Sequence, residues 1–354
     1  MMKDLEIRIY SAEMEFQGIV DDASSFQWTR KYYEPGSFEL HCPITVTNME
    51  LLRRGNLVWK RGAVEAGVIE SLKLEETASK AEITAKGRFL SSYMSRRLIR
   101  PYYHIEDGLV ETAMREIFSN AAAIPLVELG ETKGYTETVT FQATYKNLLT
   151  YEEKLAKFSE TGFRFRADFV TKKIIFELYR GEDHTAGQSD RERVVFSDAY
   201  RNLSKTEYTE NDQSYKTICY VGGSGEGTDR TIVTAGDDTL AGLDRREMFL
   251  SAADVQQGDL TTDQYKAALI QRGTDELKNN QLSISVSSEV DPQGNFVYGV
   301  DYDLGDVVTV QKKDFGVSED LRIVEINEIY ENGVFKITPT FGSPLPDTVD
   351  WSDN

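Results

Sequence analysis

The chain has 354 residues, 40% hydrophobic and 11% aromatic, which is enough for two or three domains with their own cores. Its formal net charge of −19, from 40 basic and 59 acidic residues, argues against tight binding to nucleic-acid phosphates or an anionic membrane. The two cysteines lie far apart and predict neither a disulfide framework nor a zinc site. The first residues lack a signal-peptide core, and no apolar run could span a membrane. We therefore expect a soluble protein made in the cytoplasm.

Residues 1–100 are expected to form an antiparallel β-domain. Several short segments alternate apolar and polar residues, as half-buried strands do; they are 5–10, 26–33, 38–44, 56–60, 67–74 and 80–86. Between the second and third segments, Pro35 and Gly36 predict a type II turn in which Gly36 has a positive φ. Residues 87–99 are compatible with a short helix or a last strand, and the helix is favoured. The many short strands predict a small barrel or sandwich.

The period changes to that of helices in residues 101–194. A first amphipathic helix is expected from residue 106 to about 121, with Asp107 near its start. A second is expected over 146–159, with Thr144 as N-cap and Gly162 just past its end. Alternation then returns in two segments that predict a hairpin, 163–165 and 174–179. The pattern indicates a small helix–helix–hairpin unit.

Residues 195–342 are again dominated by strand patterns, interrupted by one helix. The expected strands are 203–209, 215–221, 230–234, 281–287, 306–310, 321–330 and 333–341. The helix is placed at about 261–279, where Thr261 and Gln264 can form a capping box. The tail 343–354 has no periodicity and is expected to be loose.

No pattern in the sequence predicts chemistry. His41, His104 and His184 are scattered, without the spacing of metal ligands or of a catalytic pair. The glycine-rich segment 221–230 lacks the lysine of a phosphate-binding loop and precedes a strand pattern, so it is interpreted as a hairpin loop. Segment 301–312 has lysine where a calcium loop requires glutamate. We therefore assign no catalytic, cofactor-binding or metal-binding residues, and expect no cofactor and no enzymatic activity.

The order of the segments carries more information than any single motif. It runs from "WTRKYYEPGSFELHCP" through "LLRRGNLVWKRG" and "TYKNLLTYEEKLAKFSETGFRFRADF" to "YDLGDVVTVQ" and "LRIVEINEIYENGVFKITPTFG". Over about residues 1–342 this order resembles the minor tail proteins of long-tailed phages and prophages. That family is similar to the baseplate hub of contractile phages and to the type VI secretion spike.

The resemblance implies a mainly β (α+β) fold, with two small antiparallel β-barrel domains separated by the small αβ domain. It also implies a homotrimeric ring in the virion tail that joins a sixfold tail tube to a threefold spike or fibre. The implied partners are a distal tail or tail-tube protein above, and a tape-measure protein and a spike, fibre or receptor-binding protein below. DNA would pass through the ring without specific binding, and an acidic lumen would keep phosphates from adhering.

Two other functions compete with this hypothesis. A carbohydrate- or receptor-binding β-module at the tail tip would use aromatic side chains such as Trp28, Tyr32 and Tyr33 to stack on sugar rings. A glycosidase would use one of the many carboxylate pairs, but the sequence does not single one out.

Overall fold

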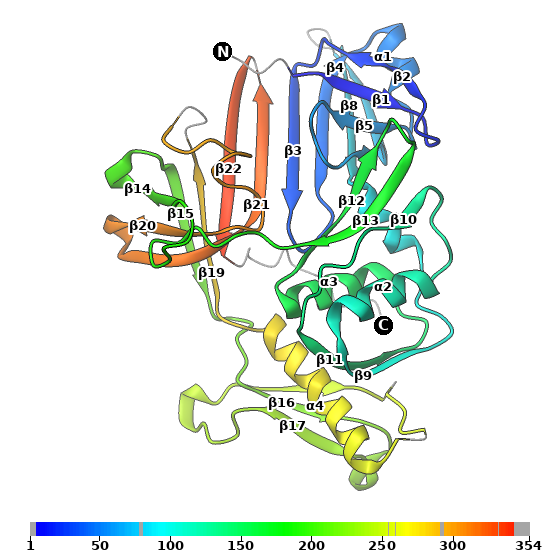
Figure 1. The fold of residues 1–354 in the computed structure, drawn as a ribbon, viewed down its shortest axis with the longest axis vertical. Coiled ribbons are helices and arrows are strands. Elements are labelled where there is room, and N and C mark those ends of the chain that lie inside the picture. The colour runs from blue at the N-terminus through cyan, green and yellow to red at the C-terminus, as the bar shows by residue number, and fades with distance from the viewer. Residues whose placement is uncertain are drawn as a thin grey trace.

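The computed structural model describes residues 5–77, 81–253, 255–258, 260–290, 294–331 and 333–342. The expected loose tail, 343–354, therefore lies outside the described residues. The fold is mainly β, and most strand pairs are antiparallel (Figure 1). None of the helices in the described part is long and apolar enough to cross a bilayer.

One long sheet runs through both β-regions. From edge to edge its strands are β15 (Ser204–Asn211), β19 (Ser283–Glu289), β22 (Val334–Gly342), β21 (Val317–Glu331), β3 (Ser25–Lys31), β4 (Ser37–Pro43), β8 (Ala81–Arg88) and β7 (Ser71–Glu76). Two further strands, β20 (Val307–Lys312) and β14 (Val195–Ser197), extend from β21. The two β-regions meet where β3 pairs with β21, with Trp28 directly opposite Glu328.

A smaller sheet backs the first half of the long sheet. It consists of β2 (Phe16–Val20), β1 (Ile7–Tyr10), β5 (Leu57–Lys60) and β6 (Gly67–Val68). Its apolar side chains share a core with Phe26, Trp28 and Leu40 of the long sheet. Within the described residues no sheet closes into a barrel, so the expected barrels are corrected to open, layered sheets. The reason is that β3 pairs with β21 of the second β-region, so the first β-region does not close on itself.

The middle of the chain forms the expected αβ unit. It contains β9 (Tyr103–Leu109), α2 (Val110–Asn120), β10 (Val127–Leu129), β11 (Thr138–Ala143), α3 (Leu148–Ser159), β12 (Gly162–Asp168) and β13 (Lys173–Tyr179). The two helices and the β12–β13 hairpin share the largest hydrophobic core, around Met114, Leu155 and Phe165. Two short helices precede this unit: α1 (Val46–Leu51) and the 3₁₀ helix η1 (Leu90–Arg96), which confirms the helix expected within 87–99.

The caps of α2 and α3 differ from those expected. Asp107 belongs to β9, with φ 44°, and does not cap α2. The N-cap of α3 is Asn147, whose side chain accepts a hydrogen bond from the backbone N–H of Thr150, in place of Thr144. The residue in the left-handed conformation after α3 is Glu160, whereas Gly162 begins β12.

Glycine at positions 162 and 305 lets the backbone approach one tyrosine ring. A Cβ on Gly162 would lie 2.5 Å from the Tyr32 ring, and one on Gly305 would lie 2.4 Å from it. The Tyr32 hydroxyl donates to the carbonyl oxygens of Glu160 at 3.1 Å and of Tyr179 at 3.3 Å. Tyr32 is thus packed where the first β-region, the αβ unit and the second β-region meet.

The connection after β3 is not the type II turn that the sequence predicts. Gly36 does not have a positive φ. A Cβ there would lie 2.3 Å from the carbonyl oxygen of Thr29 and 2.5 Å from the ring of Phe89. Glycine is therefore required by close packing, and the turn assignment is wrong.

Residues 212–282 form a separate unit, inserted between the paired strands β15 and β19 (Figure 1). It contains a three-stranded sheet of β17 (Ile232–Gly236), β16 (Ile218–Gly222) and β18 (Glu247–Ser251), with α4 (Thr262–Asn279) on one face. The capping box predicted for Thr261 and Gln264 is confirmed. Gly273 sits where a Cβ would lie 2.6 Å from Val221, so α4 packs closely on its own sheet.

Candidate assembly surfaces

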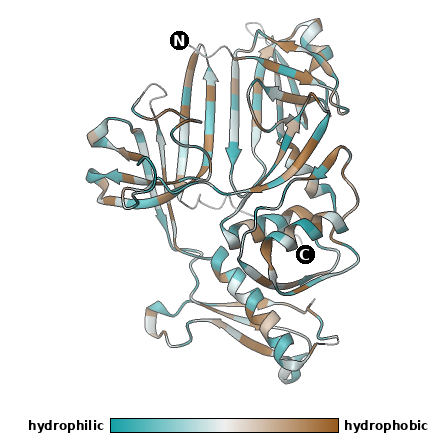
Figure 2. Ribbon diagram, in the orientation of Figure 1, coloured by the Kyte–Doolittle hydropathy of each residue, from teal (hydrophilic) through white to brown (hydrophobic). Residues whose placement is uncertain are grey.

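The long sheet has one buried face and one polar face. Along β3 and β21, inward side chains such as Trp28 and Ile326 are fully buried. The residues between them point the other way; Thr29, for example, donates a hydrogen bond to Asn327 at 3.2 Å. Figure 2 shows the resulting alternation of hydrophilic and hydrophobic residues along these strands. The outward side chains are exposed or half-buried, and the polar face extends over both β-regions.

Acidic and basic residues alternate on this polar face and pair with one another. The ion pairs join Lys86 to Glu39 at 2.8 Å, Arg88 to Glu70 at 2.9 Å, Lys336 to Glu289 at 3.5 Å and Lys31 to Glu325 at 3.9 Å. In each of these four pairs a base offsets an acid, so charges of both signs are interleaved on this face.

A buried polar cluster lies beneath the junction of β3 and β21. The guanidinium of Arg30 donates to Tyr298 at 2.7 Å and to Asp303 at 2.5 Å, and lies 3.8 Å from Glu65. Burial raises the pKa of Glu65 to about 7, although Arg30 acts in the opposite direction. Arg30 belongs to the first β-region and Asp303 to the second, so the cluster ties the two together.

A buried ion pair reinforces the same junction. Lys60 of β5 pairs with Glu328 of β21, whose side chain is only 3% exposed. Tyr330 also donates a hydrogen bond to this carboxylate, at 3.0 Å. A buried carboxylate needs such partners, since burial without them is strongly unfavourable.

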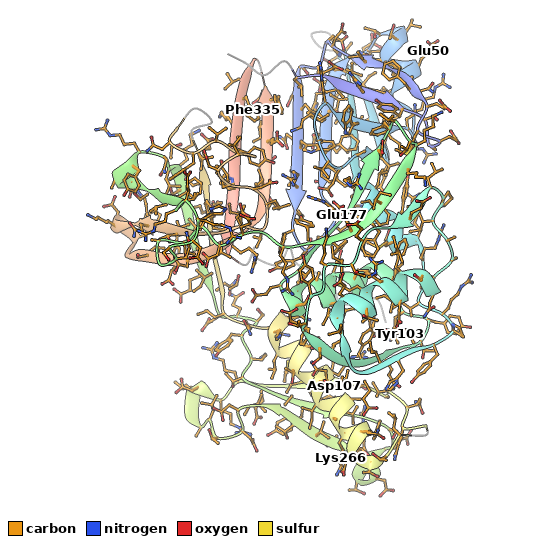
Figure 3. All side chains as sticks on the ribbon, in the orientation of Figure 1. Glu50, Tyr103, Asp107, Glu177, Lys266 and Phe335 are labelled. Carbon is orange, nitrogen blue, oxygen red and sulfur yellow. The ribbon has the colours of Figure 1, made fainter. Side chains whose placement is uncertain are left out.

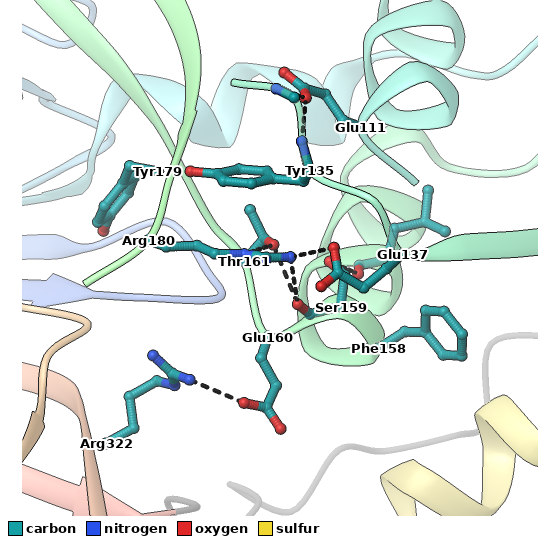
Figure 4. A network of polar contacts seen from close by, with 12 residues as sticks. Glu111, Tyr135, Glu137, Phe158, Ser159, Glu160, Thr161, Tyr179, Arg180 and Arg322 are labelled. Carbon is teal, nitrogen blue, oxygen red and sulfur yellow. Dashed lines mark hydrogen bonds and ion pairs between the residues drawn. The ribbon is translucent and has the colours of Figure 1, made fainter. Parts of the chain in front are cut away.

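A second network joins the αβ unit to the long sheet (Figure 4). Arg180, at the end of β13, donates to Glu137 at 2.5 Å and to Thr161 at 2.9 Å. The hydrogen bond from Arg180 lowers the pKa of Glu137. Arg322 of β21 donates to Glu160 at 2.9 Å. The Arg180 contacts tie parts of the αβ unit to one another, and the Arg322–Glu160 pair joins the end of α3 to the second β-region.

The aromatic residues considered for sugar stacking do not form a binding surface. Trp28 and Tyr32 are fully buried, and Tyr33 is half-buried. Trp28 packs against Phe89 with ring centroids 4.3 Å apart. A sugar cannot reach the buried rings of Trp28 and Tyr32, and the half-buried Tyr33 packs against the cores beneath it, so these residues do not form the predicted stacking surface.

The three histidines do not lie together in one site, and segments 221–230 and 301–312 have structural roles. His41 contacts Glu39 and Glu82, His104 stacks near Tyr102, and His184 bonds the carbonyl of Glu192. Segment 221–230 connects β16 to β17 as a hairpin, and segment 301–312 leads into β20. Among the described residues, no group of three or more His, Cys, Asp or Glu side chains is placed to hold a metal ion.

One apolar groove is lined in part by strand β2, which the sequence pattern does not predict. It lies between the small sheet and the β12–β13 hairpin and has a volume of about 730 Å³. Exposed Phe16, Ile19 and Val170 line it, together with Trp59 and Phe169. The alternation in β2 is weak because the strand lies at a sheet edge and is mostly exposed.

Comparison with known proteins identifies the family. The family model described as Siphovirus ReqiPepy6 Gp37-like protein matches residues 6–343. The chain belongs to this family of siphovirus tail proteins. A search of curated proteins gave no match.

Solved structures of tail proteins share the fold. The 43 kDa tail protein of prophage MuSo2 from Shewanella oneidensis aligns with a TM-score of 0.60 and 12% identity, over 95% of this chain and 98% of its own. A tail protein from Neisseria meningitidis aligns with a TM-score of 0.58 and 10% identity, over 96% of each chain. A chain of the Francisella PdpA–VgrG complex aligns with a TM-score of 0.51 and 10% identity, over 96% of this chain and 58% of its own. The chain is thus a phage tail protein whose fold is similar to that of other tail proteins and of a chain of the PdpA–VgrG complex.

Proposed function

We propose that three copies of this protein form a ring at the tail tip or baseplate, with the polar face of the long sheet lining the channel. The ring joins the sixfold tail tube above to a threefold spike or fibre below. Its partners are a distal tail or tail-tube protein, a tape-measure protein and a spike, fibre or receptor-binding protein. The protein acts in the virion tail as a structural part and not as an enzyme.

The observation that carries this proposal is the continuity of the long sheet across both β-regions. Three such sheets present six β-regions around one axis, which suits a sixfold neighbour. The Arg30 cluster and the Lys60–Glu328 pair hold each junction rigid. In the described part of the polar face, basic residues such as Lys86 and Lys31 pair with carboxylates, which reduces their attraction for DNA phosphates. The channel would therefore be polar with interleaved charges, which favours the alternative that much of the acidic excess lies on the outer surface and contributes to solubility.

Sedimentation and mass photometry of the purified protein test the ring, alone and with a distal tail protein. An acidic lumen would make trimerisation stronger as salt rises, because salt screens exposed charges within roughly 10 Å. Interleaved charges predict trimerisation that changes little between low and high salt.

Adding charge to the proposed channel sharpens the test. The double variant Gln27→Glu/Thr29→Glu places new carboxylates on the polar face in all three copies. We expect it to weaken the trimer at low salt and to recover at high salt. The control Val46→Glu changes a residue of α1 that is 78% exposed and should have no such effect. A monomer under every condition, even with tail components, would refute the ring.

A further inference from the structure

The inserted unit, residues 212–282, has the construction of an independent body. It leaves the long sheet after Asn211 and returns at Ser283, and these two residues are paired with each other. Its own hydrophobic core, around Val221, Tyr265 and Leu269, is separate from the three other cores. The unit is therefore joined to the sheet through two neighbouring strand ends, at one end of the longest axis of the molecule (Figure 1).

Helix α4 has two different sides. The side toward its own sheet carries the buried residues Tyr265, Leu269 and Gly273. The side toward the αβ unit carries polar residues, among them Gln264 and Lys278. Apolar burial therefore holds α4 to its own sheet, while polar contacts hold it to the rest of the protein.

The contacts that the structure describes across this boundary include several polar ones. Gln264 donates to the Glu106 carboxylate at 3.3 Å. Lys278 donates to the carbonyl oxygen of Phe158 at 3.1 Å, and its ammonium group lies 3.7 Å from the centre of the Phe158 ring. Water can replace most of such contacts, whereas it cannot replace an apolar core.

Charged groups also gather where α3 meets α4. Asp275 and Arg272 of α4 lie near Lys154 of α3, and Glu276 is close by. Burial raises the pKa of Asp275 to about 6 and lowers the pKa of Lys154. Separating the two helices would rehydrate these groups, which offsets part of the loss of the contacts.

We propose that residues 212–282 form a hinged unit that swings away from α3 and β11 about the ends of β15 and β19, and that the contact of Lys278 with Phe158 acts as its latch. Polar boundaries of this kind permit relative motion, because little apolar surface is exposed when they open. Within a tail, the motion would change the shape of one end of the protein while the long sheet stays fixed.

Distances between spin labels test the hinge in the full-length protein. One label is placed at Leu243→Cys, 95% exposed in the inserted unit, and the other at Tyr145→Cys, 60% exposed before α3. The native cysteines, Cys42 and Cys219, are fully buried, so labelling is directed to the introduced sites. A second pair, Leu243→Cys with Lys266→Cys, lies within the unit and serves as the rigid reference; Lys266 of α4 is labelled in Figure 3.

We expect two distance populations between the units and one within the unit. Lys278→Ala should raise the open population about two- to fivefold, the effect of losing one partly exposed cation–aromatic contact. Lys266→Ala, on the exposed side of α4, is the matched control. Measured with the labels at positions 243 and 145, it should leave the two distance populations unchanged. A single narrow distribution between the units, unchanged in the folded Lys278→Ala variant, would overturn the proposal.

Discussion

Replacing Lys60 by methionine tests the buried ion pair at the junction of the two β-regions. Methionine keeps much of the side-chain volume but leaves the Glu328 carboxylate, 3% exposed, without its cation. Removing one partner of a buried pair costs about 3–5 kcal/mol. Tyr330 and Tyr298 remain near the carboxylate, with oxygen–oxygen distances of 3.0 and 3.4 Å. We therefore expect a loss near the lower limit, about 3 kcal/mol.

Urea denaturation followed by tryptophan fluorescence measures this loss, because Trp28 lies directly opposite Glu328. The double variant Lys60→Met/Glu328→Gln removes the stranded charge and should recover most of the stability. As a control, Lys73→Met breaks an ion pair with Glu75 at the surface and should cost less than about 1 kcal/mol. If Lys60→Met costs no more than this control, or if the double variant is no more stable than the single one, the ion pair does not stabilise the junction.

Three further predictions address other parts of the fold. Gly36→Ala should cost about 1–3 kcal/mol in urea denaturation through overpacking, whereas Gly187→Ala, where a Cβ meets nothing within 4 Å, should be neutral; equal costs would contradict the packing explanation. Burial, with the nearby Glu34 carboxylate, raises the pKa of Glu153 from 4.5 to about 7. The folded state then retains a proton that the unfolded state releases, so stability should fall as pH rises from about 4.5 to about 7; Glu153→Gln should flatten this part of the profile, and an unchanged slope would argue against it. Thr261→Ala should destabilise α4 by about 1 kcal/mol. The loss should appear as faster amide hydrogen exchange in the first turn of α4, and unaltered exchange would show that the cap is dispensable.

Local signals in the sequence were sufficient for many elements. The capping box at Thr261 depends on residues three positions apart, and the alternation in β4 and β21 reflects one buried face. The cap of α3 was misplaced because Thr144 and Asn147 are both good N-cap residues. Only the path of the backbone decides between them.

Long-range pairings could not be predicted in the same way. Alternation shows that β3 has a buried face but not which strand lies beside it, so the pairing with β21 was not foreseen. The need for glycine at position 36 was predicted, but its cause was not, since Phe89 lies far along the chain. The sequence already contained a signal against sugar stacking. Phe26 and Trp28 are two positions apart in β3 and therefore lie on the same face, and two large apolar side chains on one face indicate that it is buried.

The pairing of β3 with β21 also has a consequence for synthesis. Thr29 and Asn327 touch in the finished sheet, although they are 298 positions apart. During translation, β3 leaves the ribosome long before its neighbour exists, and at 5–20 residues per second the delay is on the order of 15–60 s. Until then one side of β3 is an open edge, which invites wrong partners. A chain that stops before β21 cannot complete the long sheet, so a prematurely terminated product keeps the open edge of β3.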